Sequence, residues 1–463
     1  MSESEMAPVA CDDQPVASER WTRKFGLTTG LLLVVANMIG TGVFTTTGFL
    51  VADIRSIPAV LVAWCLGGLV ALCGAVTYAE LSRTFPNNGG EYQLLTRIYH
   101  PSIGFLSGCA SFVVGFSAPI AVSAMAFGEY LNGVLPDVPK RPAAVGLVVL
   151  LALLQAKWPT LGNRFQNIFT LGKVGLILAF VVGGLSLADW SHLSKPSEVS
   201  VAAAVASPAF AVGLVYISFT YAGWNAAAYV AGELRNPSRT VPLALIGGTS
   251  IVMLLYLGLN VVFLASAPVD QLAGQVRIGH VAAVSLFGEA AGRGMSLLIA
   301  IGLVSSVGAM MIGGPRVYEA VGLDYPALAV LSKRSVNGSP VIAIGLQAFV
   351  TIGLIFSMTF DELLRFIGVT LSLFAGLTVF GVFVTRRRTS GQKMTATAFL
   401  KTLPPVLFIA LESWMVWHAV RSDPRVLFAT GLVLVAAFGL YLLVSRSVSP
   451  TTANPDLRAT ADE

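Results

Sequence analysis

Long apolar segments recur along the whole chain of 463 residues, and they constrain its fold more than any other feature. A helix needs about 20 mostly apolar residues to cross a bilayer. Twelve segments meet this requirement: 27–51, 57–82, 102–131, 142–158, 165–187, 207–231, 241–265, 294–317, 340–358, 362–385, 402–420 and 425–445. Charged residues make up 11% of the chain, against about 25% in soluble domains. The sequence therefore predicts an all-α polytopic membrane protein with twelve transmembrane helices.

The distribution of positive charge predicts the orientation of these helices. The tails and the loops on the N-terminal side hold nineteen Lys and Arg residues, and the opposite loops hold eight. Such an excess marks the cytoplasmic side, so we expect both termini inside the cell and the protein in the plasma (inner) membrane. Residues 1–20 and 446–463 are polar and are predicted to be disordered cytoplasmic tails. The basic charge therefore reports topology, and nucleic-acid binding is not expected.

The first predicted span is interrupted at its midpoint by Gly40-Thr41-Gly42. Each glycine costs about 1 kcal/mol relative to alanine in a helix interior, and in hydrocarbon the freed backbone groups need partners. The sixth span places small and polar residues at a similar depth, within 217–225. Interrupted helices at corresponding positions of two halves indicate a binding site at the midplane of an inverted-repeat transporter.

The backbone groups that these two interruptions expose carry opposite charges. Amide N–H groups where the first span resumes, near 40–44, lie at the positive end of a helix dipole and can bind a carboxylate. Carbonyl groups where the first half-helices end, near 37–39 and 219–222, can accept from an ammonium group. Glycine lets the backbone itself face the ligand. The pair of charges matches the zwitterionic part of an α-amino acid.

These segments resemble the amino acid–polyamine–organocation superfamily, and within it the L-type amino acid transporters. The resemblance covers residues from about 25 to 245 and is looser in the second half. It is carried by the segments 39–44, 78–81, 88–92, 164–173, 219–225 and 232–237. The resemblance implies alternating access and a fold of two inverted repeats of five helices. The repeats would cover 21–200 and 201–385, and the last two helices would lie within 386–445.

The resemblance also implies a substrate site at the two breaks. In that site the four amides of Gly40–Val43 bind the substrate carboxylate, backbone carbonyls at Met38, Ile39, Phe219 and Ala222 bind the amino group, and the ring of Phe219 forms an outer lid. The implied site residues are Met38, Ile39, Gly40, Thr41, Gly42, Val43, Phe219, Thr220, Tyr221, Ala222 and Gly223. Ala222 departs from the family pattern, which often has glycine at this position.

Lys173 lies within the fifth predicted span, where a lysine costs about 2.5–3.5 kcal/mol. One interpretation is a side chain that snorkels to the membrane interface. The other, implied by the resemblance, is a coupling residue whose ammonium replaces a sodium ion between helices one, five and eight. Transport would then be independent of sodium. No metal or other cofactor is predicted, since no Cys/His cluster has metal-ligand spacing.

Several functions are compatible with the residues alone. A permease or exchanger of neutral amino acids is favoured, because the presumed pocket shows no acidic side chain and no arginine unless Arg365 reaches it. The alternatives are an amine or polyamine permease of the same fold and proton-coupled uptake of charged amino acids. An ion channel does not need two breaks around one site. A membrane-embedded enzyme would need a nucleophile–base set, but the four histidines are scattered.

Three further expectations concern partners and isolated charges. Eukaryotic L-type proteins link to a single-span glycoprotein through a cysteine after the third span, but the loop 132–141 has none. We therefore expect a stand-alone permease without a disulfide-linked heavy chain, and its oligomeric state is left open. Glu80 is expected to pair with a loop cation and Arg365 to anchor a helix end, whereas Glu412 has no assigned role.

Overall fold

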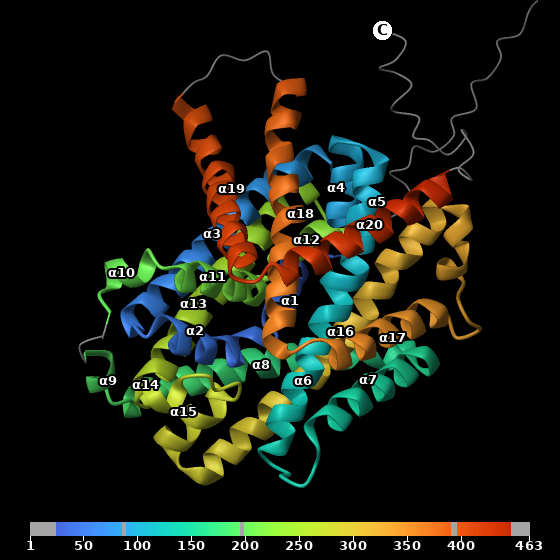
Figure 1. Ribbon diagram of the computed structural model, residues 1–463. Helices are drawn as coiled ribbons and strands as arrows, with labels where there is room; N and C mark the ends of the chain where they lie inside the picture. The colour runs from blue at the N-terminus through green and yellow to red at the C-terminus, as the bar shows by residue number, and fades with distance from the viewer. Residues whose placement is uncertain (1–24, 86–88, 195–198, 390–395, 446–463) are drawn as a thin grey trace, which may run out of the picture.

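The computed structural model describes residues 25–85, 89–194, 199–389 and 396–445, with the side chains at 159–170, 320, 389 and 396–400 excepted (Figure 1). The predicted tails 1–20 and 446–463, and Asn88 of the family-like loop, lie outside these residues. Within the described chain the structure is helical, apart from a single parallel bridge between Phe25 and Leu234. The protein is therefore an all-α polytopic membrane protein.

Each predicted span of the first half coincides with a helix or with consecutive helical pieces. The first span is divided into α1 (Leu27–Met38), the 3₁₀ turn η2 (Gly42–Phe44) and α2 (Thr46–Ile54). The next four are α3 (Ile57–Thr84), the continuous run α5 (Pro101–Ala110), η3 (Ser111–Ser117) and α6 (Ala118–Asn132), then α7 (Lys140–Lys157) and α8 (Pro159–Leu187).

The second half follows the same pattern. The sixth span is divided into α11 (Pro208–Tyr221) and α12 (Ala226–Tyr229), and the later spans are α13 (Pro237–Ser266), α16 (Glu289–Asp324), α17 (Val341–Ser357), α18 (Phe360–Thr389), α19 (Ala396–Ser422) and α20 (Arg425–Ser445). By length and composition, seven helices of the described chain can cross a membrane, and five shorter apolar helices accompany them. The total of twelve crossings stays a prediction.

Short helices fill the connections between these spans. They are α4 (Gly90–Ile98), α9 (Ser191–Ser194), α10 (Val201–Val205), η4 (Ala231–Glu233), α14 (Val269–Leu272), α15 (Ile278–Phe287) and η5 (Pro326–Ser332). The sequence predicts short helices at 279–291 and 324–332, and α15 and η5 lie there, the second as a 3₁₀ helix.

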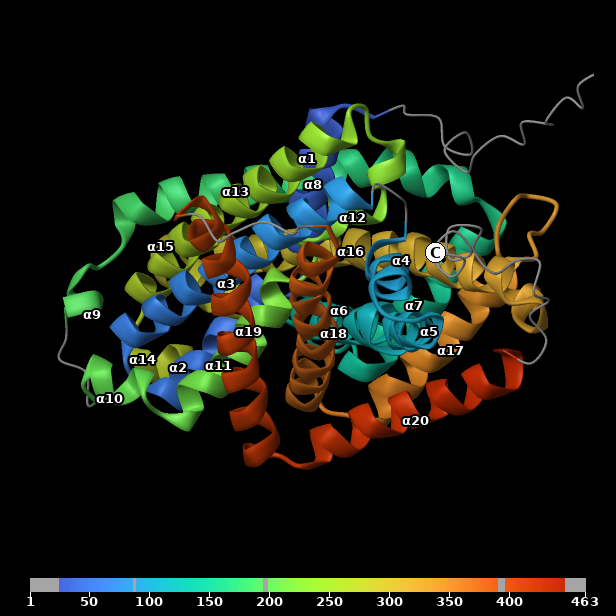
Figure 2. The ribbon, with the colours of Figure 1, turned by 90° about the horizontal axis from the view of Figure 1, so that it is seen from above.

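The interrupted helices lie in the interior, and the last helix lies at the edge. α1 packs on α13, α13 packs on α3, and α11 contacts α2, α3, α18 and α19. In the view from above, α20 runs along one border of the molecule (Figure 2). Only 17% of its most apolar 18-residue stretch is buried inside the protein, compared with 56% for the corresponding stretch of α3. The packing therefore concentrates buried surface around the two breaks.

The third span contains a feature that the sequence analysis does not predict. Residues Ser111–Ser117 form a π-helical segment, in which the hydrogen bonds run one residue further along the chain than in an α-helix. The Phe112 carbonyl in this segment accepts from the Ser117 hydroxyl at 2.8 Å and from the Tyr318 hydroxyl at 3.3 Å. Local π segments often occur at functional sites, and this one joins the third span to α16.

Candidate functional site

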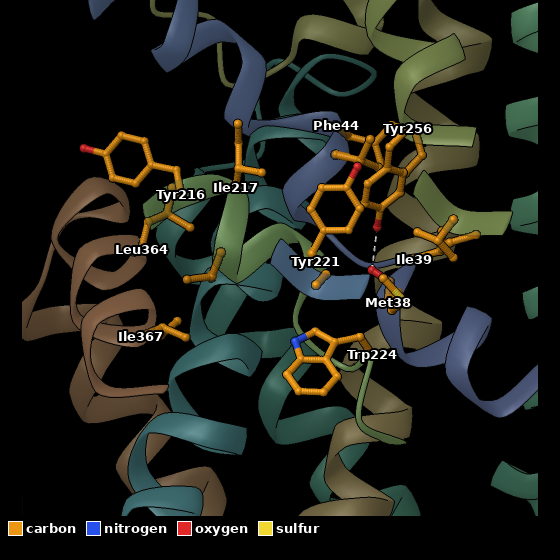
Figure 3. Close-up of a cluster of buried hydrophobic side chains, with 14 of the residues drawn as sticks. Met38, Ile39, Phe44, Tyr216, Ile217, Tyr221, Trp224, Tyr256, Leu364 and Ile367 are labelled. Carbon is orange, nitrogen blue, oxygen red and sulfur yellow. Dashed lines mark hydrogen bonds between the residues drawn. The ribbon is translucent and has the colours of Figure 1, made fainter. Parts of the chain in front are cut away.

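The two interrupted helices meet directly in the interior (Figure 3). A Cβ added to Gly42 would overlap the side chain of Thr220, and one added to Gly223 would lie 2.9 Å from the carbonyl oxygen of Asn37. The hydroxyls of Thr46 and Thr220 are 3.0 Å apart. Gly223 also adopts a φ of +98°, which side chains rarely tolerate. Both glycines are therefore required for the close approach of the two breaks.

The first break begins with a tight turn and leaves a row of free amides. Ile39, at φ −74° and ψ 85°, is the centre of an inverse γ-turn in which the Gly40 N–H donates to the Met38 carbonyl at 2.8 Å. The first hydrogen bond of η2 is donated by Phe44. Within the described chain, the N–H groups of Thr41, Gly42 and Val43 therefore have no backbone acceptor. Three of the four amides assigned to a carboxylate are free, and the fourth closes the turn.

Most of the carbonyls assigned to the amino group already accept a hydrogen bond. Met38 O accepts from the Tyr256 hydroxyl at 2.6 Å, shown as a dashed line in Figure 3, as well as from Gly40. Phe219 O accepts from the Ala222 N–H at 3.0 Å. Since a carbonyl oxygen has two lone pairs, Met38 O is saturated. Ile39, Phe219 and Ala222 keep acceptor capacity.

Lys173 joins three helices at the first break. Its side chain, on α8, is buried, with a residue exposure of 7%. Nζ donates to the Ile39 carbonyl beside the break at 3.2 Å and to the Ser306 hydroxyl of α16 at 2.8 Å. The ammonium therefore lies among helices one, five and eight, beside the first break. Of the family-like segment 164–173, the side chains of 164–170 lie outside the described residues.

Tyr221 and Thr220 face different neighbours at the second break. The Tyr221 ring packs against Trp64 and Tyr256, and its hydroxyl donates to the Trp64 carbonyl at 3.3 Å. Thr220 instead faces the first break. Tyr221 thus lies on the α3 side of α11, whereas Phe219 is partly buried against the hydrophobic core.

Four polar residues that support the first break are absent from the sequence-based site. Tyr256 binds Met38 O, and the Tyr130 hydroxyl donates to Phe44 O at 2.7 Å. Ser123 hydrogen-bonds the Thr41 hydroxyl, and Asn260 accepts from Thr47. All four lie in α6 or α13. Their signal in the sequence is a polar group inside an apolar span, which in a membrane marks a buried partner.

Two further charges, Arg365 and Glu80, are paired away from the breaks. Arg365 donates to the Tyr216 hydroxyl at 2.9 Å and lies 3.1 Å from Asp361, so it joins α18 to α11. Glu80 forms an ion pair with Arg386 at 2.7 Å, which agrees with the expected pairing, although Arg386 belongs to the end of α18. Arg365 therefore contributes no charge to the space between the breaks.

Comparison with known proteins gives a consistent result. A family model described as amino acid permease matches residues 25–454. The b(0,+)-type amino acid transporter 1 of Mus musculus is 26% identical over 446 residues, which cover 90% of this chain and 88% of the relative. The serine/threonine exchanger SteT of Bacillus subtilis is 27% identical over 429 residues (90% and 96%). The large neutral amino acids transporter small subunit 2 of Homo sapiens is 23% identical over 431 residues (91% and 80%).

Proposed function

This chain belongs to the amino acid permease family, and we propose that it carries neutral amino acids across the membrane by alternating access, independently of sodium. The observation that carries this proposal is the pair of facing breaks, with three free amides beside carbonyls that can still accept. We further propose that the two breaks open two inverted repeats, 21–200 and 201–385.

The free backbone groups supply both halves of a zwitterion site. The N–H groups of Thr41, Gly42 and Val43 form a positively polarised start to η2 and would bind the substrate carboxylate. The carbonyls of Ile39, Phe219 and Ala222 would accept from the amino group. Since these are backbone groups, they recognise the part that all α-amino acids share. The substrate side chain must be selected elsewhere.

Lys173 supports sodium independence. A sodium ion at this position would need the oxygen atoms of Ile39 and Ser306, and the Lys173 ammonium already donates to both. A fixed ammonium thus performs the structural role of a bound cation, because it holds the end of the first half-helix against α8 and α16.

A neutral substrate fits the charges around the breaks. Arg365 is held by Tyr216 and Asp361, and Glu80 by Arg386. Relatives named for large neutral amino acids and for serine/threonine support the same class. We also propose that the carrier acts without a disulfide-linked heavy chain, because the loop 132–141 offers no cysteine for such a link. We further propose that it is not an enzyme, that it lies in the plasma (inner) membrane, and that both of its termini are cytoplasmic.

Counterflow in proteoliposomes tests the proposal. Vesicles preloaded with unlabelled amino acid are exposed to labelled serine, leucine, arginine or glutamate, in sodium or in choline buffer. We expect saturable uptake of serine or leucine at equal rates in both buffers, and weak uptake of the charged pair. Competition by the decarboxylated amines ethanolamine and isoamylamine, equal to that by serine and leucine, would instead support an amine permease. Uptake that requires sodium would contradict the role given to Lys173.

A further inference from the structure

A narrow cavity lies behind the second break, between α3, α11 and α19. Its walls include Val70 of α3, Phe408 and Glu412 of α19, and Ser218 and Tyr221 of α11. The free space is constricted to about one water molecule. An amino acid cannot enter such a space, so any ligand must be as small as a proton, a water molecule or a bare ion.

Glu412 is the acidic side chain in this cavity, and its hydrogen bonding is incomplete. The residue is only 5% exposed. Oε1 accepts from the Ser218 hydroxyl at 3.5 Å, which is the outer limit of a hydrogen bond. Among the described residues, Oε2 has no hydrogen-bond partner within 3.5 Å, and the same holds for the Ser372 hydroxyl of α18, which lies beside the carboxyl group. The carboxyl group is thus buried and faces a cavity whose walls offer it few hydrogen bonds.

The groups that face Glu412 leave it without a compensating cation. On α11 these are Ser218 and Tyr221, and the Tyr221 hydroxyl donates to the Trp64 carbonyl. α3 contributes small and aliphatic residues, and α18 contributes Ser372. Among the described residues that line the cavity, none carries a positive charge. An ionised carboxylate is strongly disfavoured in such surroundings.

We propose that Glu412 binds and releases a proton during the transport cycle and so couples amino acid transport to a proton gradient. The proposal rests on the permease function proposed above. In the conformation described here the carboxyl group is neutral, with its proton on the carboxyl oxygen. When water reaches the cavity, the O–H bond breaks, the proton passes to that water, and a carboxylate remains. The carboxylate takes a proton back before the cavity closes again, and nothing is oxidised or reduced.

The position of the cavity explains how protonation is linked to movement. Ser218 and Tyr221 lie in the last turn of α11, and Trp224 in the break that follows also lines the cavity. Alternating access requires a broken helix of this kind to shift against its neighbours. Any shift of α11 relative to α19 changes the hydration of Glu412. Protonation of Glu412 and movement of α11 are therefore linked equilibria, and each changes the equilibrium constant of the other by the same factor.

The test uses the full-length protein in proteoliposomes with a pH-sensitive dye inside and the membrane potential clamped at zero. For one proton per amino acid, an inward gradient of about one pH unit should drive about tenfold accumulation. We expect the wild type to approach this ratio and to acidify the interior as substrate enters. In E412Q we expect the ratio to fall to about 1, while counterflow slows by no more than about fivefold. The exposed acid Glu289 provides the control E289Q, which should match the wild type in both readouts.

Other outcomes would overturn the proposal. Wild-type counterflow without any proton movement, or gradient-driven accumulation that persists in E412Q, would show that Glu412 is not the coupling group. Accumulation that depends on sodium and is lost in E412Q would assign the cavity to a metal cation. If E412Q is not monodisperse, E412D replaces it, and an unchanged pH dependence of accumulation in E412D would count against the proposal. Absence of counterflow for every amino acid in the wild type would instead refute the proposed function.

Discussion

The two breaks differ in what holds them. The first break is fixed by side chains from three other helices: Tyr256 binds Met38 O, Lys173 binds Ile39 O, and Tyr130 binds Phe44 O. The second break turns at Gly223, at φ +98°. Its own side chains make the contacts there: Thr220 with Thr46, Tyr221 with the Trp64 carbonyl, and Asn225 with Glu91 at 3.0 Å. Side chains of other helices therefore bind the backbone carbonyls of the first break, whereas the second break is held mainly through its own side chains.

Lys173→Ala should have the largest effect, because it removes the cation that joins the first break to α8 and α16. The Ile39 carbonyl and the Ser306 hydroxyl would lose a charged donor inside the membrane, which typically costs about 1.5–3 kcal/mol. We expect uptake to fall by at least about tenfold, with a monodisperse, folded protein. Lys140→Ala removes an exposed lysine paired with Glu129 and should leave uptake unchanged. Normal uptake by Lys173→Ala would refute the role of the ammonium.

Gly42→Ala tests the contact between the two breaks. The added methyl group would overlap Thr220, and overpacking of this kind costs about 1–3 kcal/mol. We expect counterflow to fall by about five- to a hundredfold. Gly40→Ala is the matched control two residues away, since its Cβ would meet only the Met38 carbonyl oxygen, at 3.9 Å. Equal losses in the two variants would show that helix propensity, and not the contact with Thr220, sets the requirement for glycine.

Tyr256→Phe removes one hydrogen bond and keeps the ring. The hydroxyl donates to Met38 O at 2.6 Å and makes a longer contact of 3.4 Å with Thr220 O, so the loss should fall mainly on the first break. A neutral hydrogen bond contributes about 0.5–1.5 kcal/mol, so we expect the substrate concentration for half-maximal uptake to rise by about two- to tenfold. Tyr441→Phe, in the peripheral α20, should change nothing. An unchanged affinity in Tyr256→Phe would show that the break is held without this bond.

Glu91→Gln should have the smallest effect and concerns the second break. Glu91 lies in α4, between the second and third predicted spans. Burial raises the pKa of its carboxyl group, against the opposing effect of hydrogen bonds from Tyr78 and Asn225. The folded state thus binds the Glu91 proton more tightly than the unfolded state. Protonation of Glu91 therefore stabilises the folded protein at low pH, and this contribution is lost as the pH rises through the pKa of Glu91 in the folded state.

We therefore expect the melting temperature of the wild type in detergent to fall by about 1–3 °C more than that of Glu91→Gln between pH 5 and pH 8. Glu289→Gln should keep the wild-type slope. Parallel curves for the wild type and Glu91→Gln would show that the Glu91 carboxyl does not titrate in this range.

The breaks themselves were predictable because their cause is local. Gly40, Gly42 and Gly223 interrupt apolar runs, and the cost of glycine in a helix depends on little beyond the residue itself. The family match over residues 25–454 confirms the superfamily assignment. Lys173 lies beside Ile39, which is 134 residues away in the chain. This position could be predicted only from the resemblance to the family.

The residues that support the first break could not be predicted from their spacing in the sequence. Tyr256 reaches Met38 across 218 residues. Its place inside an apolar span indicates a buried partner but does not identify which group that partner is. The γ-turn at Ile39, which uses the Gly40 amide, and the π segment Ser111–Ser117 depend on backbone geometry that many sequences can adopt. Glu412 stands out in the sequence as an acid within an apolar span, but its meaning depends on the cavity, which forms only when α3, α11 and α19 come together.

Lys173 has an energetic consequence for the carrier as a whole. A dissolved ion that fills such a position arrives from one compartment and leaves into the other, and its concentration difference supplies free energy in each cycle. A side chain is bound to the polypeptide by four methylene groups and has no such concentration difference. The contact between Lys173 and the first break therefore needs no sodium ion from either side. The direction of net flux must be set entirely by solutes that are free to dissociate.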